Sequence, residues 1–447
     1  MPRTARDRTW QAAFARWLRP YLAALRREAQ RHWAPVYLQG LLGPGERKSV
    51  APMAARVAPD DVQQLHHFVA TSPWATAPLE RVLAETAQRL VGGPQAVLII
   101  DDTALPKQGR HSVGVARQYC GALGKTANCQ TLVSLTLARG EVPVPLALRL
   151  YLPQEWTADP ARCRRAGVPP TVTFQPKGEL AIVELDRVRA AGVRFGTVLA
   201  DAGYGTSAAF RQALSARGLT WAVGVLSTQR VYPLDVRLRP ARPGQMGRPS
   251  KHSAPSVPSQ PGAEAITELG PRAFRRVTWR RGTKGPLAAA FAAVRVRIAD
   301  GPRVARGRHL PGEPAWLVCE RRAGGEQKYY LTNHPARTSL ATLARVIKAR
   351  WVCEQSHQQM KEELGLDHYE GRNWTGLHHH ALLSLIAFAF LQHWRLTHPA
   401  DGKKTARPAR PAAPAHAAGR AAGAARSRPR PAPPMSAVSC PTPATAA

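Results

Sequence analysis

The chain has 447 residues and a formal net charge of +34, from 63 Lys and Arg against 29 Asp and Glu. This length exceeds the roughly 250 to 300 residues at which single cores stop growing, so two or more domains are expected. Six scattered Cys residues without a C-x-x-C pair exclude a disulfide framework and a zinc-finger spacing, and they favour a reducing compartment.

The charge indicates a polyanionic partner, because nucleic acid is the commonest partner of so basic a soluble protein. A GC-rich gene that encodes Arg, Ala, Pro and Gly freely is the alternative explanation. The N-terminus lacks the apolar core of a signal peptide, and the most apolar run, 381–391, is too short for a membrane span of about 20 residues. We therefore expect a soluble protein with no membrane partner, in which this run forms a buried helix.

The first part of the chain has helical periodicity, with large apolar residues at spacings of three and four. Helical segments are expected within 10–33, 50–56, 59–70 and 78–90. A basic helical module could hold DNA in a groove, but no helix-turn-helix signature is evident. A helical packing domain explains the pattern nearly as well.

Two short apolar strands are expected to end in carboxylates. The first, V-L-I-I-D-D-T, is a continuous apolar run typical of a strand buried on both faces, and it ends at Asp101 and Asp102. The second, T-V-L-A-D, ends at Asp201. If these strands are neighbours, their acids come together and form a candidate site. A hairpin of 132–138 and 142–152 and helices at 179–191 and 207–217 are expected around them.

Basic residues and Gly are concentrated between 107 and 130, where Lys107, Arg117 and Lys125 are candidate DNA contacts. Further along, short strands and a mobile loop at 240–262 indicate a β-rich insertion. Its segment W-R-R-G-T-K-G offers Trp279 and Lys284 to a DNA backbone or an unstacked base. A plain surface hairpin explains that segment equally well.

The segment from Ser339 to Leu364 is expected to be largely helical, because good helix formers fill it and neither Gly nor Pro interrupts it. At 3.6 residues per turn, one stripe of the helix carries two cations, a carboxylate and an imidazole within about 60° of one another. These residues are Arg350, Glu354, His357 and Lys361. An apolar stripe beside them would press the helix onto a core, so a site could form at its edge.

Three carboxylates from two strand ends and a helix suit hard divalent ions such as Mg²⁺, which take oxygen ligands. With two ions, one activates water or a 3′-hydroxyl and the other stabilises the leaving oxygen of a phosphodiester. Arg350 and Lys361, close to Glu354 on one stripe, would hold the flanking phosphates. A di-iron site at the E-x-x-H of Glu354 is a weaker alternative, because it needs a second E-x-x-H on a four-helix bundle.

Six motifs together are more specific than any one of them. They are I-D-D-T at 100–103, S-V-G-V-A-R-Q-Y at 112–119, G-K-T-A-N-C-Q at 124–130, L-Y-L-P-Q-E-W at 150–156, A-D-A-G-Y-G at 200–205, and A-R-W-V-C-E through K-E-E-L-G-L-D-H-Y-E-G-R at 349–372. In these motifs the chain resembles the bacterial insertion-sequence transposases of the DDE type, with a ribonuclease-H-like catalytic core. The resemblance runs from about Gln39 to Arg395.

The resemblance implies an α/β fold, in which a ribonuclease-H-like mixed sheet is flanked by helices and joined by a helical N-terminal domain and a β-rich insertion. It implies that Asp101, Asp201 and Glu354 are the catalytic metal ligands, with Asp102 an open alternative to Asp101. Arg350 and Lys361 have the family's spacing to the glutamate and would contact DNA phosphates, although Ile347 stands where the family has Tyr.

The resemblance also implies two Mg²⁺ ions, for which Mn²⁺ could substitute. The partners would be terminal inverted repeats, target DNA and a second copy of the chain, in the bacterial cytoplasm and at the nucleoid when DNA is bound. The expected domains are 1–92, helical and DNA-binding; 93–219, the first part of the core; 220–333, the insertion; 334–398, the last part of the core; and 399–447, a disordered Pro/Ala/Arg-rich tail. Two other functions stay open: an inactive or regulatory DNA-binding derivative, and a structure-specific ribonuclease-H-like nuclease.

Overall fold

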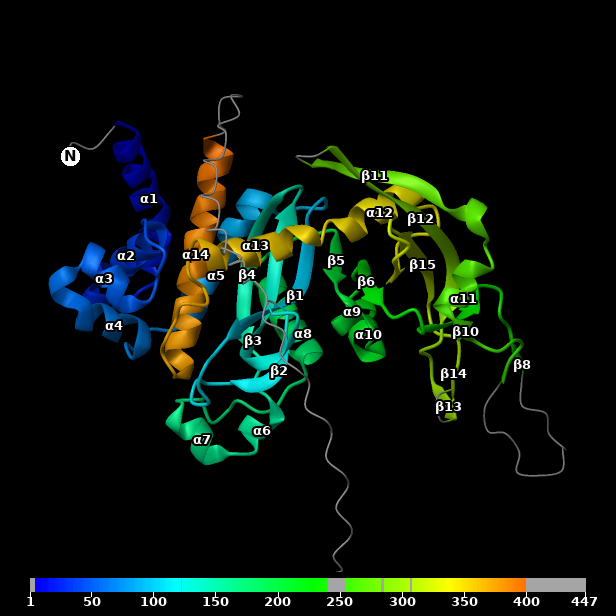
Figure 1. Cartoon of the computed structure of the whole chain (residues 1–447), viewed down its shortest axis with the longest axis horizontal. Helices are drawn as coiled ribbons and strands as arrows, with labels where there is room; N and C mark the ends of the chain where they lie inside the picture. The colour runs from blue at the N-terminus through cyan, green and yellow to red at the C-terminus, as the bar shows by residue number, and fades with distance from the viewer. Residues whose placement is uncertain (1–4, 122, 240–253, 283–284, 306–307, 399–447) are drawn as a thin grey trace, which may run out of the picture. The chain divides into compact units, whose positions relative to one another are not determined.

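One 12-stranded mixed sheet, covered by helices, runs through the computed structural model (Figure 1). The structure describes residues 5–121, 123–239, 254–282, 285–305 and 308–398. Three predictions fall wholly or mostly outside these residues, namely the contact Lys284, the loop at 240–262 and the tail from 399. The mixed sheet between helices confirms the predicted fold class, while the division into five domains stays a prediction.

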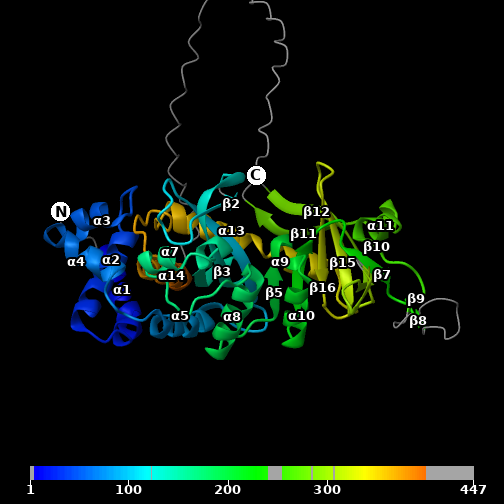
Figure 2. The same ribbon diagram turned by 90° about the horizontal axis from the view of Figure 1, so that it is seen from below.

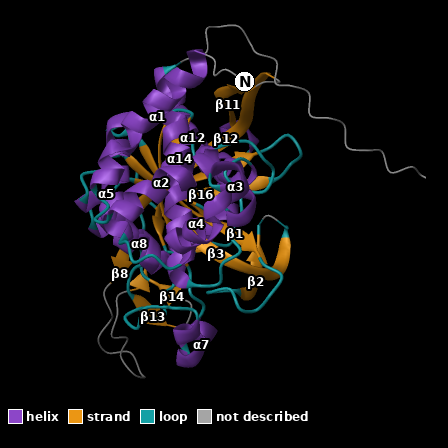
Figure 3. Cartoon of the chain, turned by 90° about the vertical axis from the view of Figure 1, so that its left-hand side faces the viewer, coloured by secondary structure: helices purple, strands orange, loops and turns teal. Residues whose placement is uncertain are grey.

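The N-terminal part is helical, as predicted from its periodicity, and Figure 3 shows its helices together on one side of the sheet. Its helices are α1 Ala5–Ala23, α2 Glu28–Leu42, α3 Val50–Val57, the 3₁₀ turn η1 Pro59–Asp61, α4 Val62–Ala70 and α5 Thr76–Val91. Aromatic rings fasten α1 to the last helix of the chain, with the ring of Phe14 5.0 Å from that of Phe390. This part of the chain therefore shares a core with α14 Trp374–Thr397.

The next part contains the carboxylate-bearing strands and confirms the predicted hairpin, which turns at Gly140. Its strands are β1 Val97–Pro106, β2 Ala116–Cys120, β3 Lys125–Arg139, β4 Val142–Leu150, β5 Thr197–Ala200 and β6 Trp221–Val225. The first strand pairs antiparallel with β3 and parallel with β5, and β5 pairs parallel with β6. Its helices are α6 Gln154–Thr157, α7 Pro160–Arg165, α8 Lys177–Ala190, α9 Ala202–Gly205 and α10 Ala208–Ala216.

The β-rich part continues the same sheet, because β16 pairs with β6 through main-chain hydrogen bonds. Its elements are β7 Arg230–Pro233, β8 Leu238–Arg239, β9 Ala254–Pro255, β10 Gln260–Pro261, α11 Gly262–Thr267, η2 Pro271–Ala273, β11 Arg275–Gly282, β12 Gly285–Ile298, β13 Arg303–Ala305, β14 Arg308–His309, β15 Pro314–Arg321 and β16 Gln327–Thr332. The insertion is thus an extension of the central sheet, built onto the strand that follows the second aspartate.

The helix predicted from Ser339 to Leu364 is interrupted. The segment forms α12 Leu340–Lys348 and α13 Trp351–Glu362, with a turn at Ala349 and Arg350 between them. Figure 2 shows α13 on one side of the core sheet and α5 and α8 on the other. Because Arg350 keeps helical backbone angles, its spacing to Glu354 remains that of one helical turn.

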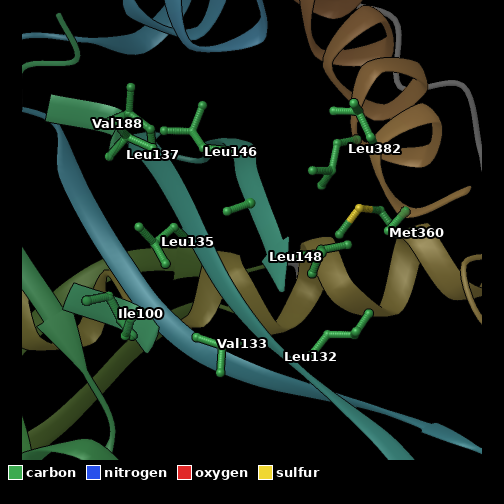
Figure 4. Close-up of a cluster of buried hydrophobic side chains, with 14 of the residues drawn as sticks. Ile100, Leu132, Val133, Leu135, Leu137, Leu146, Leu148, Val188, Met360 and Leu382 are labelled. Carbon is green, nitrogen blue, oxygen red and sulfur yellow. The ribbon is translucent and has the colours of Figure 1, made fainter. Parts of the chain in front are cut away.

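The last helix, α14 Trp374–Thr397, confirms that the apolar run is a buried helix. It is the one described helix long and apolar enough to cross a membrane, but 78% of its apolar window is buried inside the structure. Figure 4 shows Leu382 of α14 and Met360 of α13 close to Leu148 of β4, so both helices pack on the sheet. On β4, Arg149 also pairs with Glu80 of α5 at 2.6 Å and Glu184 of α8 at 2.7 Å.

Candidate active site

Asp101 within β1 lies beside Asp201, which directly follows β5. The predicted end of the first strand at Asp101 and Asp102 is wrong, because pairing with β3 continues β1 to Pro106. The parallel pairing of β1 with β5 sets Ile100 opposite Ala200. Asp101, the next residue of β1, and Asp201, the first residue after β5, therefore lie at the same level, at the carboxyl edge formed by the end of β5. In open α/β sheets this edge is where ligands bind. The predicted meeting of the two acids therefore follows from the register of these strands.

The turn after β5 fixes the direction of Asp201. Its side chain caps α9, because Oδ1 accepts a hydrogen bond from the Tyr204 backbone N–H at 3.3 Å. The turn packs closely on β6, since a Cβ added to Gly205 would lie 2.0 Å from the carbonyl oxygen of Gly224. A side chain at either glycine would push the turn away from β6. Gly205 of A-D-A-G-Y-G thus serves close packing on β6, whereas a Cβ at Gly203 would lie 3.1 Å from Asp201 Oδ1.

Glu354 in the first turn of α13 is joined to Asp101 through Arg350. The guanidinium Nη1 lies 2.5 Å from Asp101 Oδ2, and Nη2 pairs with Glu354 Oε1. The Asp101 side chain is 11% exposed, whereas that of Glu354 is 58% exposed. One Arg side chain therefore bridges an interior carboxylate and a surface carboxylate.

All three predicted carboxylates line one cavity of about 800 Å³. Its wall includes residues of β1, β2 and α13, together with Asp201 directly after β5. The lining residues are Asp101, Asp102, Thr103, Ala104, Gln118, Tyr119, Gly121, Thr131, Lys177, Asp201, Arg350, Glu354, His357, Gln358, Lys361, Glu362 and Asp367. The cavity thus combines acids with basic side chains, as binding of phosphodiesters would need.

The two neighbouring aspartates of β1 have different partners. Successive strand residues point to opposite faces, so Asp101 shares its face with Ile99, which clusters with Cys353 of α13. Asp102 points the other way, where its oxygens accept hydrogen bonds from Lys177 Nζ at 2.6 Å and from the Tyr204 hydroxyl. Asp101 therefore faces the glutamate helix, and Asp102 ties β1 to α8 and α9.

The sequence alone predicts no role for Lys177 or Tyr204. Tyr204 stands within the motif A-D-A-G-Y-G, which marks this stretch as a candidate functional segment. The motif does not indicate that the tyrosine contacts Asp102. Nothing near Lys177 marks it in the sequence. Such partners follow from which helix covers which face of the sheet.

Burial sets the charge of Asp101. It raises the pKa of this carboxyl to about 7, with repulsion from Asp201 acting in the same direction and attraction to Arg350 acting against it. A carboxyl group that is protonated below neutral pH is a poor ligand for a cation until it loses its proton. Binding of a cation in the cavity would therefore be coupled to loss of the proton from Asp101.

This coupling predicts how divalent-metal binding depends on pH. For the DNA-free protein, the apparent Mn²⁺ affinity should fall about tenfold per pH unit below pH 7, because one proton is displaced, and level off above it. Titration calorimetry from about pH 5.5 to 8.5 measures this slope. In the Asp101→Asn variant the proton-linked slope should vanish along with most of the affinity. A wild-type affinity that stays flat across pH 7 would contradict the expectation.

The donor set fits a hard divalent ion, because it consists of carboxylate oxygens. Within the described ranges, no three His, Cys, Asp or Glu side chains stand close enough together to hold an ion. The ion pairs explain this spacing, since Arg350 lies between Asp101 and Glu354 and bonds to both. The guanidinium supplies the positive charge that the acids require in this arrangement.

Two lysines predicted to contact DNA are turned inward. Nζ of Lys361 lines the cavity and donates to the carbonyl oxygen of Ala104 at 2.9 Å. Nζ of Lys107 donates to the carbonyl oxygen of Tyr369 at 2.7 Å. Burial lowers the pKa of both amines. The structure thus brings Lys361 to the predicted acids but places Lys107 outside the cavity.

Other predicted contacts differ in exposure. Arg117 on β2 and Lys125 on β3 are exposed to solvent. Trp279 is half-buried, with its ring 6.0 Å from Phe291 and Lys348 Nζ 4.6 Å from its centre. Its ring is already packed, so the structure gives less support to base contact at Trp279 than to phosphate contact at the exposed cations.

The histidines do not form a di-iron centre. His357 lines the cavity, but burial lowers its pKa to about 3 and its Nε2 lies 3.6 Å from Cys353 Sγ. The His379 ring nitrogens contact the main-chain carbonyls of Val69 and Trp74. The imidazoles of residues 378–380 pack α14 against its neighbours. This agrees with the prediction that the site is built from carboxylates rather than from histidines.

Comparison with known proteins defines the family. The sequence profile of the DDE superfamily endonucleases matches residues 20–286, more than half of the chain. The chain therefore belongs to the DDE superfamily endonuclease family, whose members typically use divalent metal ions. The match includes Asp101 and Asp201 and ends before Glu354.

The proteins similar to this chain include one curated protein and one solved structure. The chain is 32% identical over 193 residues to the "Probable transposase for insertion sequence element IS701" of Microchaete diplosiphon, an alignment that covers 43% of this chain. The chain spans about half the length of that curated relative, 48%. The cryo-EM structure of a piggyBac transposase synaptic complex with hairpin DNA aligns with 86% of this chain and 73% of its own, at a TM-score of 0.41 and 12% identity.

Proposed function

We propose that this protein is a DNA transposase that cuts at the ends of an insertion sequence and joins those ends to target DNA. The main support is the position of Asp101 on β1, level with Asp201 at the end of the parallel strand β5, with Glu354 in the same cavity. Membership of the DDE endonucleases and the similarity to a probable transposase of insertion sequence IS701 also support it.

In this proposal, Asp101, Asp201 and Glu354 hold two Mg²⁺ ions, for which Mn²⁺ could substitute. Bound ions of this kind activate the attacking water or 3′-hydroxyl and stabilise the leaving oxygen. Asp102 holds Lys177 and so keeps the middle of β1 in place. The bidentate fork of Arg350 turns from the carboxylates to a DNA phosphate, and Lys361 binds a neighbouring phosphate as a point charge.

The substrates are the terminal inverted repeats of the element and a target DNA. The net charge of +34 favours such polyanions. We assign repeat binding to the helical part at 1–92, chemistry to 93–219 and 334–398, and a supporting role to the insertion at 220–333. Work on two DNA ends calls for a dimer or larger assembly, acting as a soluble protein in the bacterial cytoplasm.

The test uses the full chain, Mg²⁺ and labelled DNA that carries the inverted repeats flanking its gene, with a plasmid as target. We expect cuts at the repeat ends and products in which those ends are joined to the plasmid. Cleavage of branched DNA without joining would favour a structure-specific nuclease. Repeat binding without any cleavage would favour an inactive or regulatory derivative.

A further inference from the structure

Tyr119 stands out at the rim of the cavity. Its side chain is 68% exposed, the largest value among the exposed large hydrophobic residues that the structure describes. It lines the same cavity as Asp101 and Glu354. Water contact with an aromatic ring is unfavourable, and burial of that ring stabilises a complex. A ring in this position therefore indicates a ligand that covers it.

Strand β2, which carries Tyr119, is held in place by burial and by hydrogen bonds. On β2, residues 118 and 120 point away from the exposed face, and Cys120 is fully buried. Gln118 Nε2 donates to the carbonyl oxygen of Cys129 on β3 at 3.0 Å, and Asn128 Nδ2 donates to that of Lys107 at 2.8 Å. The ring is thus presented by a two-stranded ribbon, which Figure 2 shows at the margin of the fold.

The charges around Tyr119 identify the ligand class. Arg117 lies two residues away on the same strand, so it shares the exposed face, and it is itself exposed. Lys125, at the start of the paired strand, is exposed as well, but it pairs with Cys120 and so belongs to the opposite face of the ribbon. An aromatic ring with a cation beside it can hold an unpaired nucleotide, with the base on the ring and a phosphate on the cation. Binding of a protein partner would not explain why an aromatic ring and a cation lie together beside a proposed phosphodiester site.

We propose that Tyr119 stacks on an unpaired base next to the phosphate that enters the cavity. This inference rests on the proposed function and adds that the preferred DNA has unpaired nucleotides at the reacting end. The sequence alone also offers Trp279 for such a contact. The ring of Trp279 is packed by Phe291 and Lys348, whereas Tyr119 is open to the cavity.

The test compares two fluorescein-labelled duplexes, one fully paired and one with four unpaired thymines at one end. Binding to the full-length protein is followed by anisotropy in EDTA, so the outcome is independent of metal and cleavage. We expect tighter binding of the frayed duplex. Tyr119→Ala should lose at least about fivefold in affinity for the frayed duplex, the lower end of what a stacked base contributes, and little for the paired one. Tyr119→Phe should retain the preference.

Phe174→Ala is the matched control, because Phe174 is another partly exposed aromatic residue and lies outside the cavity lining. Circular dichroism checks that each variant is folded. An unchanged preference in Tyr119→Ala, or an equal loss in Tyr119→Phe, would overturn the inference and leave the proposed function intact. A change in oligomeric state without a change in DNA preference would overturn it too, since the ring would then cover a second copy. Failure of the unchanged protein to bind either duplex would instead count against the proposed function.

Discussion

Asp201→Asn is expected to lower metal-dependent DNA cleavage by more than about a hundredfold while DNA binding changes little. Loss of a group that merely orients a metal ligand costs roughly 10- to 100-fold, so loss of a charged ligand should cost more. The fold should survive, because Asn keeps an oxygen that can accept the hydrogen bond from the Tyr204 backbone N–H. Initial cleavage rates at saturating DNA, with binding measured in EDTA, check both statements.

Two further variants make this experiment specific. Asp186→Asn is the control, because Asp186 also pairs with an arginine, Arg217 at 2.7 Å, but lies half-exposed and outside the cavity lining. It should cleave normally. Asp102→Asn should show an intermediate loss of roughly 10- to 100-fold, because Asp102 bonds to Lys177 and Tyr204 and acts through them. Full cleavage by Asp201→Asn would remove this residue from the metal site.

The two aspartates could be predicted because their signal is local. A run of apolar residues buried on both faces indicates a central strand, and a carboxylate directly after the run is a site candidate, whether the strand ends there, as β5 does, or continues, as β1 does. This reasoning finds Asp101 and Asp201, and it needs only that the strands be neighbours, which the pairing of β1 with β5 supplies. The helical stripe at Arg350 and Glu354 is local in the same way.

The partners of these acids could not be predicted, because they depend on which element covers each face of the sheet. Alternation along β1 separates Asp101 from Asp102, but only the positions of α13 and α8 determine that Arg350 and Lys177 meet them. Propensity also misses the break between α12 and α13, since no Gly or Pro marks it. There, α12 packs on the extended sheet of the insertion and α13 on the core, so tertiary packing ends one helix and begins the next.

Arg350→Gln is expected to raise the Mn²⁺ affinity of the DNA-free protein at least about tenfold and to lower the rate of DNA cleavage. Metal binding must break two charged hydrogen bonds of Arg350, to Asp101 and Glu354, and such bonds contribute about 1.5 to 3 kcal/mol each. Removing the guanidinium also removes a positive charge that repels the ion. Since 1.4 kcal/mol corresponds to about tenfold, even one such bond accounts for the expected gain.

The two opposite effects distinguish a competing cation from a structural one. Arg350→Lys keeps the charge but loses the planar fork that reaches both carboxylates, so its metal affinity should lie between those of the other two proteins. Arg345→Gln, on the exposed side of α12, should leave affinity and cleavage unchanged. If Arg350 only stabilised the fold, Arg350→Gln would lower the melting temperature and leave the Mn²⁺ affinity as it was. Tighter metal binding with slower cleavage would mean that the guanidinium holds the acids apart from the metal until DNA phosphate takes it away.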